Sequence, residues 1–436
     1  MHPLNRKEAA TIPIISRTLT DGTLLETLYC PLKSSTSLAM MTPDGRVSIS
    51  ESVEHAGERL VPYSPRNNLL ATGCVLLPAA VGDFEDVGDL VREIRSFLHR
   101  YVDLTPLFEE IAAHYILLTW VYDAFSELGY LRLRGDYGTG KTRALRTIGA
   151  LCYKPFFASG ASTVSPIFHV LDAVGGTLVL DEADFRFSDA TVDLTKILNN
   201  GTVKGLPVLR TMADRHRELN PRAFSVFGPK VIGMRHEFAD AALESRFLTE
   251  ETGRRPLRPD IPIHTPASLM TEAAALRDKL LAWRFHARWR VGPDPSRLVA
   301  GVEPRRNQTI LALLSLVEDA ALRERIGAAL VDEEARVLEE RASTLEATML
   351  ALLVEAFRTL PTPHVLVAEC TKRFNAGRER TEGQVSNKWV GWVLRKRLRL
   401  TTVRVRGVYA VPRTELEKIL ALAVRHGVMQ ENRDHA

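Results

Sequence analysis

The sequence predicts an α/β fold built around a parallel sheet that binds a nucleotide, and two observations carry that prediction. The first is the segment Tyr130–Arg146, YLRLRGDYGTGKTRALR, in which Gly135, four residues and then Gly140-Lys141-Thr142 form the G-x-x-x-x-G-K-[ST] pattern of a phosphate-binding P-loop. The second is Gly176–Glu182, GTLVLDE, an apolar strand that ends in two acids. A strand-like run before the loop and helical spacing after it supply the context that the motif requires.

The loop composition explains how a polyphosphate would be held. Glycines let backbone N–H groups turn toward phosphate oxygens without a Cβ in the way, and the next helix N-terminus adds partial positive charge. Lys141 is expected to reach the β- and γ-phosphates, and the Thr142 hydroxyl is expected to ligate Mg²⁺. The expected ATP-binding residues are Gly135, Asp136, Tyr137, Gly138, Thr139, Gly140, Lys141, Thr142 and Arg143.

The acidic pair supplies the rest of the predicted chemistry. In a parallel sheet we expect the strand before Asp181 to lie beside the P-loop strand, so that its carboxylates meet the same phosphates. Asp181 is the expected metal partner and Glu182 the expected base that orients the attacking water. Asp181–Asp184 spells DEAD, but the other motifs of DEAD-box RNA helicases are not visible in the sequence, which argues against that family.

The composition is that of an ordinary soluble protein. The 436 residues suggest about three domains, with 45% apolar and 25% charged residues. No apolar run reaches the roughly 18 residues of a membrane span. The N-terminus lacks the sections of a signal peptide, so we expect a cytoplasmic protein without a membrane partner. Four cysteines lie far apart with no C-x-x-C pair, which argues against a zinc site or a disulfide framework: Cys30, Cys74, Cys152 and Cys370.

Positive charge is concentrated near one end of the chain. From Lys372 to Arg406 there are eleven Lys or Arg against two Glu, a local charge of +9, so the remainder of a chain with net charge +4 sums to about −5. This distribution favours a nucleic-acid partner for the C-terminal part.

The segments before the P-loop predict supporting structure. Residues 1–84 contain short β-like runs broken by turn signals and are expected to form a small β-rich domain. Residues 85–127 have helical spacing and are expected to form a helical linker packed on the ATPase. Arg132 and Arg134 alternate with leucines, so the P-loop strand is less apolar than a fully buried parallel strand should be.

Residues 192–234 predict a hairpin inserted ahead of a further core strand. Pro207–Arg210 and Phe224–Phe227 are its expected strands, and the core strand begins at Lys230. A solvated surface turn is the alternative for its basic tip. Arg235 or His236, at the end of the core strand, could touch the γ-phosphate or could be surface residues. The candidate DNA-contacting residues here are Lys204, Arg210, Arg215 and Arg217.

Arg246 follows in the segment Asp240–Phe247. An arginine at this point can project across a subunit boundary and stabilise charge on the phosphoryl group transferred in the neighbouring subunit. The alternative is an ordinary ion pair with Glu244 or Glu250.

Gly135–Thr142, Asp181-Glu182, the hairpin and Glu244-Ser245-Arg246 together resemble an AAA+ ATPase of the branch that includes superfamily 3 and minichromosome-maintenance-type ring helicases, especially those of phages, plasmids and integrated elements. The resemblance covers roughly residues 128–270. It implies an AAA+ P-loop NTPase core over residues 128–265, hexameric rings, ATP and Mg²⁺ as cofactors, and a pore hairpin that grips DNA. Lys141, Glu182 and Arg246 would be the catalytic residues. Family members often place an asparagine at the end of the fourth core strand, where this chain has Gly233-Met234-Arg235.

The rest of the chain predicts two more parts. Residues 266–341 are helical and occupy the place of the family's lid, where Pro304–Gln308 resembles the start of a helix with a second arginine sensor, Arg305. A cluster of solvated charge at a helix start is the alternative. Residues 342–436 combine three helices and a two-stranded hairpin, the element order of a winged helix, with a solvated basic face as the alternative. Its expected DNA contacts are Lys388, Arg395, Lys396, Arg397, Arg399, Arg404 and Arg406.

These expectations together predict an ATP-dependent, ring-forming DNA helicase or translocase, most simply the replicative helicase of a mobile genetic element. A nucleotide-switched DNA-binding regulator or loader that never unwinds DNA is the alternative. A defence or partitioning ATPase also stays open, because the same modules recur in those proteins.

Overall fold

The computed structural model describes residues 10–160, 162–183, 189–213, 219–238, 240–342, 344–360, 362–377 and 384–429. The chain forms two compact units, Met1–Ile326 and Gly327–Ala436. The finer five-part division stays a prediction. Among the described residues, no helix combines the length and the apolar content that crossing a membrane requires.

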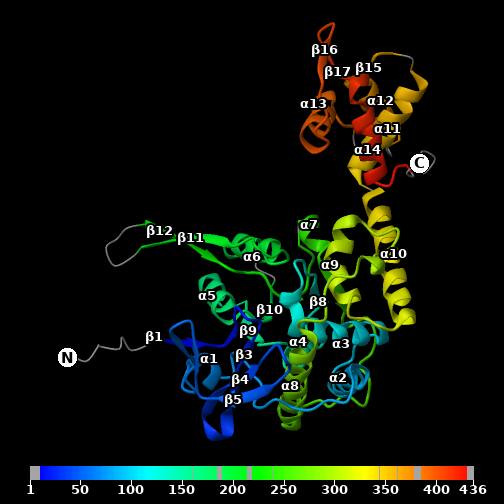
Figure 1. The fold of residues 1–436 in the computed structure, drawn as a ribbon. Helices are drawn as coiled ribbons and strands as arrows, with labels where there is room; N and C mark the ends of the chain where they lie inside the picture. Colours follow the sequence, from blue (N-terminus) through cyan, green and yellow to red (C-terminus); the bar gives the residue numbers. More distant parts are fainter. Residues whose placement is uncertain are drawn as a thin grey trace, which may run out of the picture. The chain divides into compact units, whose positions relative to one another are not determined.

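The first unit begins with two small sheets and continues into a mixed α/β core (Figure 1). The strands of the two N-terminal sheets are β1 Ala10–Ile14, β2 Ser16–Thr18, β3 Leu24–Cys30, β4 Ser35–Met41, β5 Val47–Ser50, β6 Val53–His55 and β7 Glu58–Pro62. The strands of the core and its hairpin are β8 Tyr130–Arg134, β9 Phe156–Ser159, β10 Leu178–Asp181, β11 Val208–Ala213, β12 Leu219–Phe224, β13 Lys230–Met234 and β14 Phe247–Glu251. The helices are α1 Asn68–Ala71, α2 Val87–Tyr101, α3 Pro106–Val121, α4 Lys141–Gly149, α5 Val164–Val174, α6 Asp189–Asn200, α7 Ala241–Glu244, α8 Ser268–Ala287, α9 Pro304–Leu314 and α10 Ala320–Ala342, of which α10 continues into the second unit.

The core sheet has the strand order β14-β8-β13-β10-β9, and every neighbouring pair is parallel. The expectation that β10 lies beside the P-loop strand β8 is therefore wrong, because β13 lies between them. The five residues of β13 are all buried, which suits them to the middle of a sheet covered on both faces. Since the strands are parallel, β8, β13 and β10 still end at one edge, and that edge carries the predicted site.

Ion pairs explain the arginines of β8. Arg132 is 3% exposed and pairs with Glu244 at 2.6 Å, while its Nε donates to the Thr249 hydroxyl at 3.0 Å. Arg134 donates through Nε to Glu251 at 2.6 Å. Both Thr249 and Glu251 belong to β14, so polar and charged groups on the edge strand compensate the arginines of its neighbour.

A buried polar network joins the N-terminal strands to the core. Glu26 on β3 is 4% exposed and accepts hydrogen bonds from Tyr153 Oη at 2.6 Å and from Arg284 Nε of α8 at 2.8 Å. The same guanidinium pairs with Asp123 at 2.9 Å. Breaking one member of such a network would leave an uncompensated buried charge, so these strands and α8 are fixed to the core.

The second unit contains the expected helices and hairpin, with one further strand and one further helix. Its elements are α11 Leu345–Thr359, β15 His364–Leu366, α12 Val367–Ala376, α13 Asn387–Trp392, a π-helical turn Val393–Arg397, β16 Val403–Val405, β17 Val408–Pro412 and α14 Leu416–Arg425. The strands form a sheet of order β15-β17-β16. Apolar side chains of these helices form one core, which includes Leu350, Phe357, Val393 and Ile419.

Candidate nucleotide and nucleic-acid sites

The P-loop connects β8 to α4 in the conformation that its glycines allow. Gly138 and Gly140 have φ values of 73° and 87°, in the left-handed region that residues with a Cβ rarely adopt. α4 then begins at Lys141, whose Nζ donates to the carbonyl oxygens of Gly135 at 2.7 Å and Asp136 at 2.5 Å. The lysine ammonium thus lies across the loop, with its charge on the side where phosphate oxygens would be bound.

The edge strand β14 supports the loop from the side. Thr139 Oγ1 lies 2.8 Å from Thr252 Oγ1, directly after β14. A Cβ on Gly135 would lie 2.5 Å from the Thr252 carbonyl oxygen, so this position requires glycine. Neither β14 nor its contact with the loop was predicted from the sequence. The available signal was the run Phe247-Leu248-Thr249, which includes aromatic and β-branched residues that are enriched in strands.

Thr142 and Asp181 meet at the carboxyl edge of the sheet. The Thr142 hydroxyl donates to Asp181 Oδ2 at 2.6 Å. Adjacent oxygen ligands of an octahedral Mg²⁺ lie about 2.9 Å apart, given metal–oxygen distances of about 2.0–2.1 Å. The two side chains therefore fit one Mg²⁺ as neighbouring ligands.

Glu182 directly follows β10 and has a strained backbone conformation. Its φ is 55°, which is uncommon for a residue with a side chain, and its backbone N–H donates to Asp181 Oδ1 at 2.9 Å. A Cβ on Gly160 would lie only 2.6 Å from the Glu182 carbonyl oxygen. Such local strain persists where the surrounding structure enforces it, often at functional sites, and here the Glu182 side chain is exposed at the rim of the cavity.

Two adjoining cavities share the glycines of the loop. One of about 340 Å³ is lined by the P-loop, Asp181, Glu182 and the end of β13 at Gly233–Arg235. A second, of about 670 Å³, is lined by Gly138–Gly140 and by apolar side chains that include Leu257, Ile261 and Ile263. Each cavity is of the size that small-molecule ligands use.

Arg235 lines the cavity at the phosphate edge, the first of the two places expected for it. Its guanidinium stacks on the ring of Tyr137 in the P-loop, with 3.7 Å between Cζ and the ring centroid. Arg143 instead donates to the backbone carbonyl of Ile263 at 2.5 Å and to that of Pro262, so its guanidinium faces the second cavity's wall. Its predicted role as a phosphate ligand stays a prediction.

Arg246 lies at the amino-terminal ends of the core strands, opposite to the ends that carry the P-loop, and Arg305 lies near it. The Arg246 guanidinium is buried and donates to the Asn199 carbonyl of α6 at 2.5 Å, and the Arg246 carbonyl accepts from Tyr130 N at the start of β8. Burial and the neighbouring Arg305 lower the pKa of Arg246. β8 is about 16 Å long, and Arg305 lies near Arg246 at the end of this strand remote from the loop, so its predicted contact with nucleotide stays a prediction. The alternative ion pairs of Arg246 also do not form, since Glu244 pairs with Arg132 and Glu250 bonds to Thr105.

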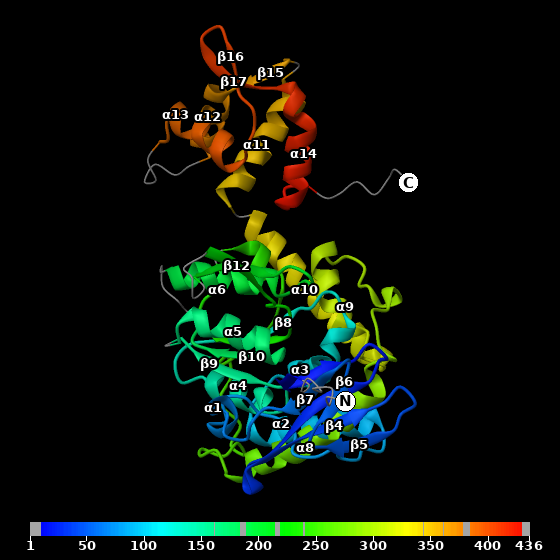
Figure 2. The ribbon, with the colours of Figure 1, turned by 60° about the vertical axis from the view of Figure 1, so that its left-hand side comes forward.

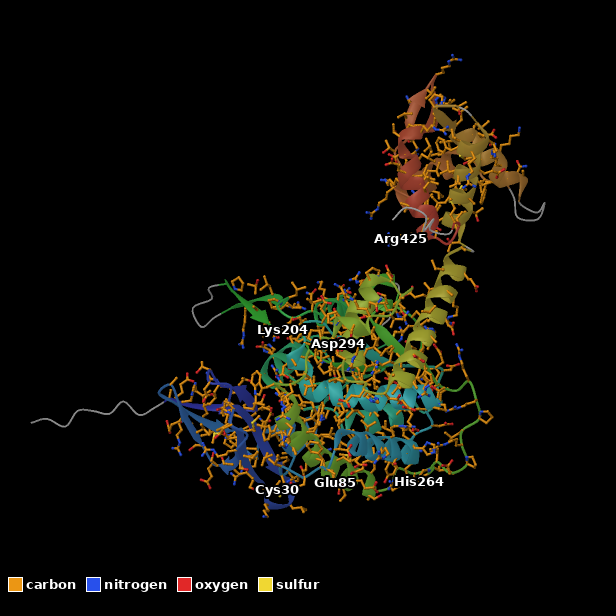
Figure 3. The ribbon with its side chains drawn as sticks, turned by 45° about the vertical axis from the view of Figure 1, so that its right-hand side comes forward. Cys30, Glu85, Lys204, His264, Asp294 and Arg425 are labelled. Carbon is orange, nitrogen blue, oxygen red and sulfur yellow. The ribbon has the colours of Figure 1, made fainter. Side chains whose placement is uncertain are left out.

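The predicted DNA-gripping hairpin is present as β11 and β12, and it runs beside α6 in both views (Figure 1, Figure 2). Its second strand is Leu219–Phe224, earlier in the chain than expected, because buried Phe224 ends the pairing opposite Val208. Arg215 and Arg217 lie outside the described residues. Lys204, labelled in Figure 3, lies at the hairpin root, where its N–H donates to the Ser126 carbonyl.

The arginines of the hairpin stem are held by the chain itself. Arg210 pairs with Asp193 of α6 at 2.5 Å and stacks on Phe168 at 4.7 Å. Its cross-strand neighbour Arg222 lies 3.5 Å from Asp172 of α5. The charge of Arg210 is thus already compensated by a carboxylate of its own chain, and its contact with DNA stays a prediction.

The basic residues of the second unit differ among themselves. Arg397 pairs with Glu346 at 2.5 Å, so its charge is also compensated. Arg399 has a φ of 52° and its carbonyl accepts from Lys418 at 2.5 Å. Arg406 and Gly407, with φ values of 49° and 85°, form the turn between β16 and β17 and present Arg406 at its tip. The predicted DNA contacts of this region are Lys388, Arg395, Lys396, Arg397, Arg399, Arg404 and Arg406, and their contact with DNA stays a prediction.

Comparison with known proteins gives structural matches alone. No protein-family model and no curated protein matches the sequence. Similar solved structures include the apo C-terminal region of NrS-1, with 11% identity, a TM-score of 0.40 and coverage of 89% of this chain and 96% of that one. The SCCmec type IV Cch active helicase has 12% identity, a TM-score of 0.37 and coverage of 94% and 80%. The JCV helicase has 13% identity, a TM-score of 0.25 and coverage of 57% and 61%. Each TM-score is below 0.5, so the inferences below rest on the residues of this chain.

Proposed function

We propose that this protein is an ATP-driven motor that acts on DNA, with a ring-forming helicase or translocase as its specific form. One observation carries the nucleotide part of the proposal. Lys141, Thr142, Asp181 and Glu182 come from two separate elements and line one cavity at the carboxyl edge of a parallel sheet. This is the place where open α/β sheets bind ligands.

Each residue then has a chemical task. The loop N–H groups and Lys141 would bind the phosphates, and Thr142 and Asp181 would hold Mg²⁺, which would neutralise phosphate charge. Glu182 accepts a proton from, or orients, the water that attacks the γ-phosphate. The second cavity, beside Gly138–Gly140 and lined in part by Leu257, Ile261 and Ile263, is the space available to the base and ribose.

The arginines at the amino-terminal ends of the core strands support the proposed assembly. Arg305 is close enough to disfavour the charge of Arg246, and the Arg246 guanidinium donates to the backbone carbonyls of Leu198 and Asn199, which carry no full negative charge. An anion supplied by a neighbouring copy would relieve that repulsion. This supports a trans-acting role for Arg246, with Arg305 beside it, in a homo-oligomer that we take to be a hexamer. Arg246 would have to leave the α6 carbonyls to act in this way.

The experiment compares wild type with Lys141→Ala and Arg246→Ala, using ATP turnover with and without DNA and strand separation of a forked duplex. Lys141→Ala should abolish turnover. Arg246→Ala should keep nucleotide binding and lose most hydrolysis, and activity should return on mixing with Glu182→Gln subunits. Full turnover in Lys141→Ala would remove the site assignment, and unchanged turnover in Arg246→Ala would remove the assembly role.

A second candidate, a nucleotide-switched DNA-binding regulator or loader, is favoured by one observation. Arg210 and Arg222 on the hairpin stem are bonded to aspartates of their own chain, which leaves fewer stem charges for DNA. The forked duplex separates the two candidates, because ATP and wild-type protein should unwind it if the motor proposal holds and leave it intact if the protein is a switch. A role in replicating a mobile genetic element would require that the protein unwinds the forked duplex.

A further inference from the structure

A tryptophan lies in the middle of the basic face of α13 and the turn that follows it. Trp392 is 49% exposed, whereas its neighbours Val390 and Val393 are fully buried in the core of the unit. Lys388 precedes it by four residues on α13 and so shares its side of that helix, and Arg395 and Lys396 are exposed in the π-helical turn that follows directly. A large apolar ring therefore stands among cations on an exposed surface.

A second aromatic ring extends this surface onto the β16–β17 hairpin. Tyr409 is 44% exposed and lies opposite Arg404 in the strand pairing. The Arg404 guanidinium carbon is 5.1 Å from the ring centroid, and that of Arg395 is 5.0 Å from it. Arg395 thus connects the hairpin to the helix that carries Trp392. We call Trp392, Arg395, Arg404 and Tyr409 the aromatic–basic face.

Sequence composition determines the charge of this region. Between Gln384 and Thr414 there are eight Lys or Arg and no Asp or Glu. Such a surface suits a polyanion and repels a basic protein partner. Exposed aromatic rings add flat apolar surface on which a planar base can stack and a phosphate cannot.

We propose that the aromatic–basic face binds single-stranded nucleic acid by stacking its unpaired bases on Trp392 and Tyr409 while the arginines contact the backbone. In a duplex the base faces are covered by neighbouring bases, and groove recognition uses polar edges, so a duplex would leave these rings uncovered. Unpaired bases offer planar faces that stack on aromatic rings and guanidinium planes regardless of sequence. The inference rests on the proposed action on DNA and deepens it by naming the strand state that this unit recognises, and it requires no ATP.

The test uses the full chain without nucleotide and measures fluorescence anisotropy with three labelled probes. The probes are a mixed-sequence single-stranded DNA, the blunt duplex of that sequence, and an abasic strand with the same number of phosphates. Trp392→Ala and Tyr409→Ala should each weaken single-strand binding by roughly 5- to 150-fold, which corresponds to about 1–3 kcal/mol for one stacked base. Binding of the duplex and the abasic strand should change little.

Matched variants separate stacking from damage to the fold. Trp392→Phe and Tyr409→Phe keep a ring and should retain most of the single-strand affinity. Val408→Ala changes an exposed side chain on the neighbouring position of the hairpin and should have no effect. Circular dichroism checks that each variant is folded.

Three results would overturn the inference. The first is unchanged single-strand affinity in both alanine variants. The second is an equal loss for the duplex and the abasic strand, which would indicate a phosphate-binding or duplex-binding role. The third is a wild-type protein that binds none of the probes, which would point to a protein partner. Lys141→Ala should bind the probes as wild type does, so a failure of the ATPase proposal leaves a different signature.

Discussion

Two antiparallel hairpins in this molecule are rich in arginine, yet their arginines have different surroundings. In β11–β12, Arg210 and Arg222 are paired with Asp193 and Asp172 of adjacent helices. In β16–β17, Arg404 stacks on Tyr409 inside a stretch of sequence that contains no acid. A count of basic residues therefore does not identify a nucleic-acid surface. The groups that already compensate each charge decide whether it is available.

The strongest test of the contrast substitutes each pair of arginines and measures DNA affinity. Arg404→Ala with Arg406→Ala should weaken DNA binding roughly 150-fold, because each substitution removes a charge-assisted hydrogen bond of about 1.5 kcal/mol and the two losses sum to about 3 kcal/mol. The slope of log affinity against log salt should fall by about 1.4 to 1.8. Arg210→Ala with Arg222→Ala should change affinity less than about twofold by the same assay, since charge already compensated contributes little. Equal losses in the two double variants would remove the distinction between the hairpins.

A second prediction concerns the root of the first hairpin, where Lys230 is completely buried. Its Nζ donates to the carbonyls of Val226 at 3.0 Å and Gly228 at 2.9 Å, after β12, and lies 3.5 Å from that of Gly201, before β11. Burial lowers the pKa of Lys230 to about 7, whereas the unfolded chain keeps an ordinary lysine pKa near 10.5. Between these values the unfolded state binds more protons, so raising the pH stabilises the folded state.

The expected gain is about 1.4 kcal/mol per pH unit between roughly pH 7.5 and 9.5. It is measured as the difference between wild type and Lys230→Met in the free energy of urea unfolding of the first unit. Lys204→Met, which changes an exposed lysine at the same root, should leave the slope as in wild type. A wild-type slope that persists in Lys230→Met would show that another group titrates.

The smallest expected effect concerns the stability of the hairpin stem. Arg210→Ala should lower the free energy of unfolding by about 0.5–1 kcal/mol, because the Arg210–Asp193 pair is partly exposed and the stacking on Phe168 is removed as well. Arg210→Lys keeps the charge but loses the planar stack, and it should fall between wild type and alanine. Thermal unfolding with matched buffers measures this, and a larger loss in Arg404→Ala than in Arg210→Ala would reverse the assignment of structural and binding arginines.

The local parts of the nucleotide site could be predicted from the sequence, whereas its neighbours could not. The P-loop, the start of α4 and the Asp181-Glu182 pair depend on contiguous residues with a fixed chemical pattern. The strand order depends on competition between β10 and β13, which are similarly apolar, so nothing local told which one would lie beside β8. The partner of Arg210 is Asp193, seventeen residues earlier in the chain, and no sequence pattern links the two.

The C-terminal unit illustrates the same limit. The expected third helix, Val385–Arg399, appears as α13 followed by a π-helical turn, and its apolar face was predicted correctly at Val390, Val393 and Leu394. The exposure of Trp392 was not predicted, because a tryptophan near an apolar helix face is ordinarily expected to be buried. Only the fold shows that Val393 and Leu394 occupy the core while Trp392 remains outside.

Strand β14 has one further consequence. Thr252, just past one end, touches the phosphate loop, and Arg246, just before the other end, lies at the far edge of the sheet. An extended backbone paired along its whole length to β8 does not stretch, so β14 sets a fixed separation between Thr252 and Arg246. β14 therefore joins the phosphate-binding loop to the region around Arg246, for which we propose contact with an adjacent copy of this chain.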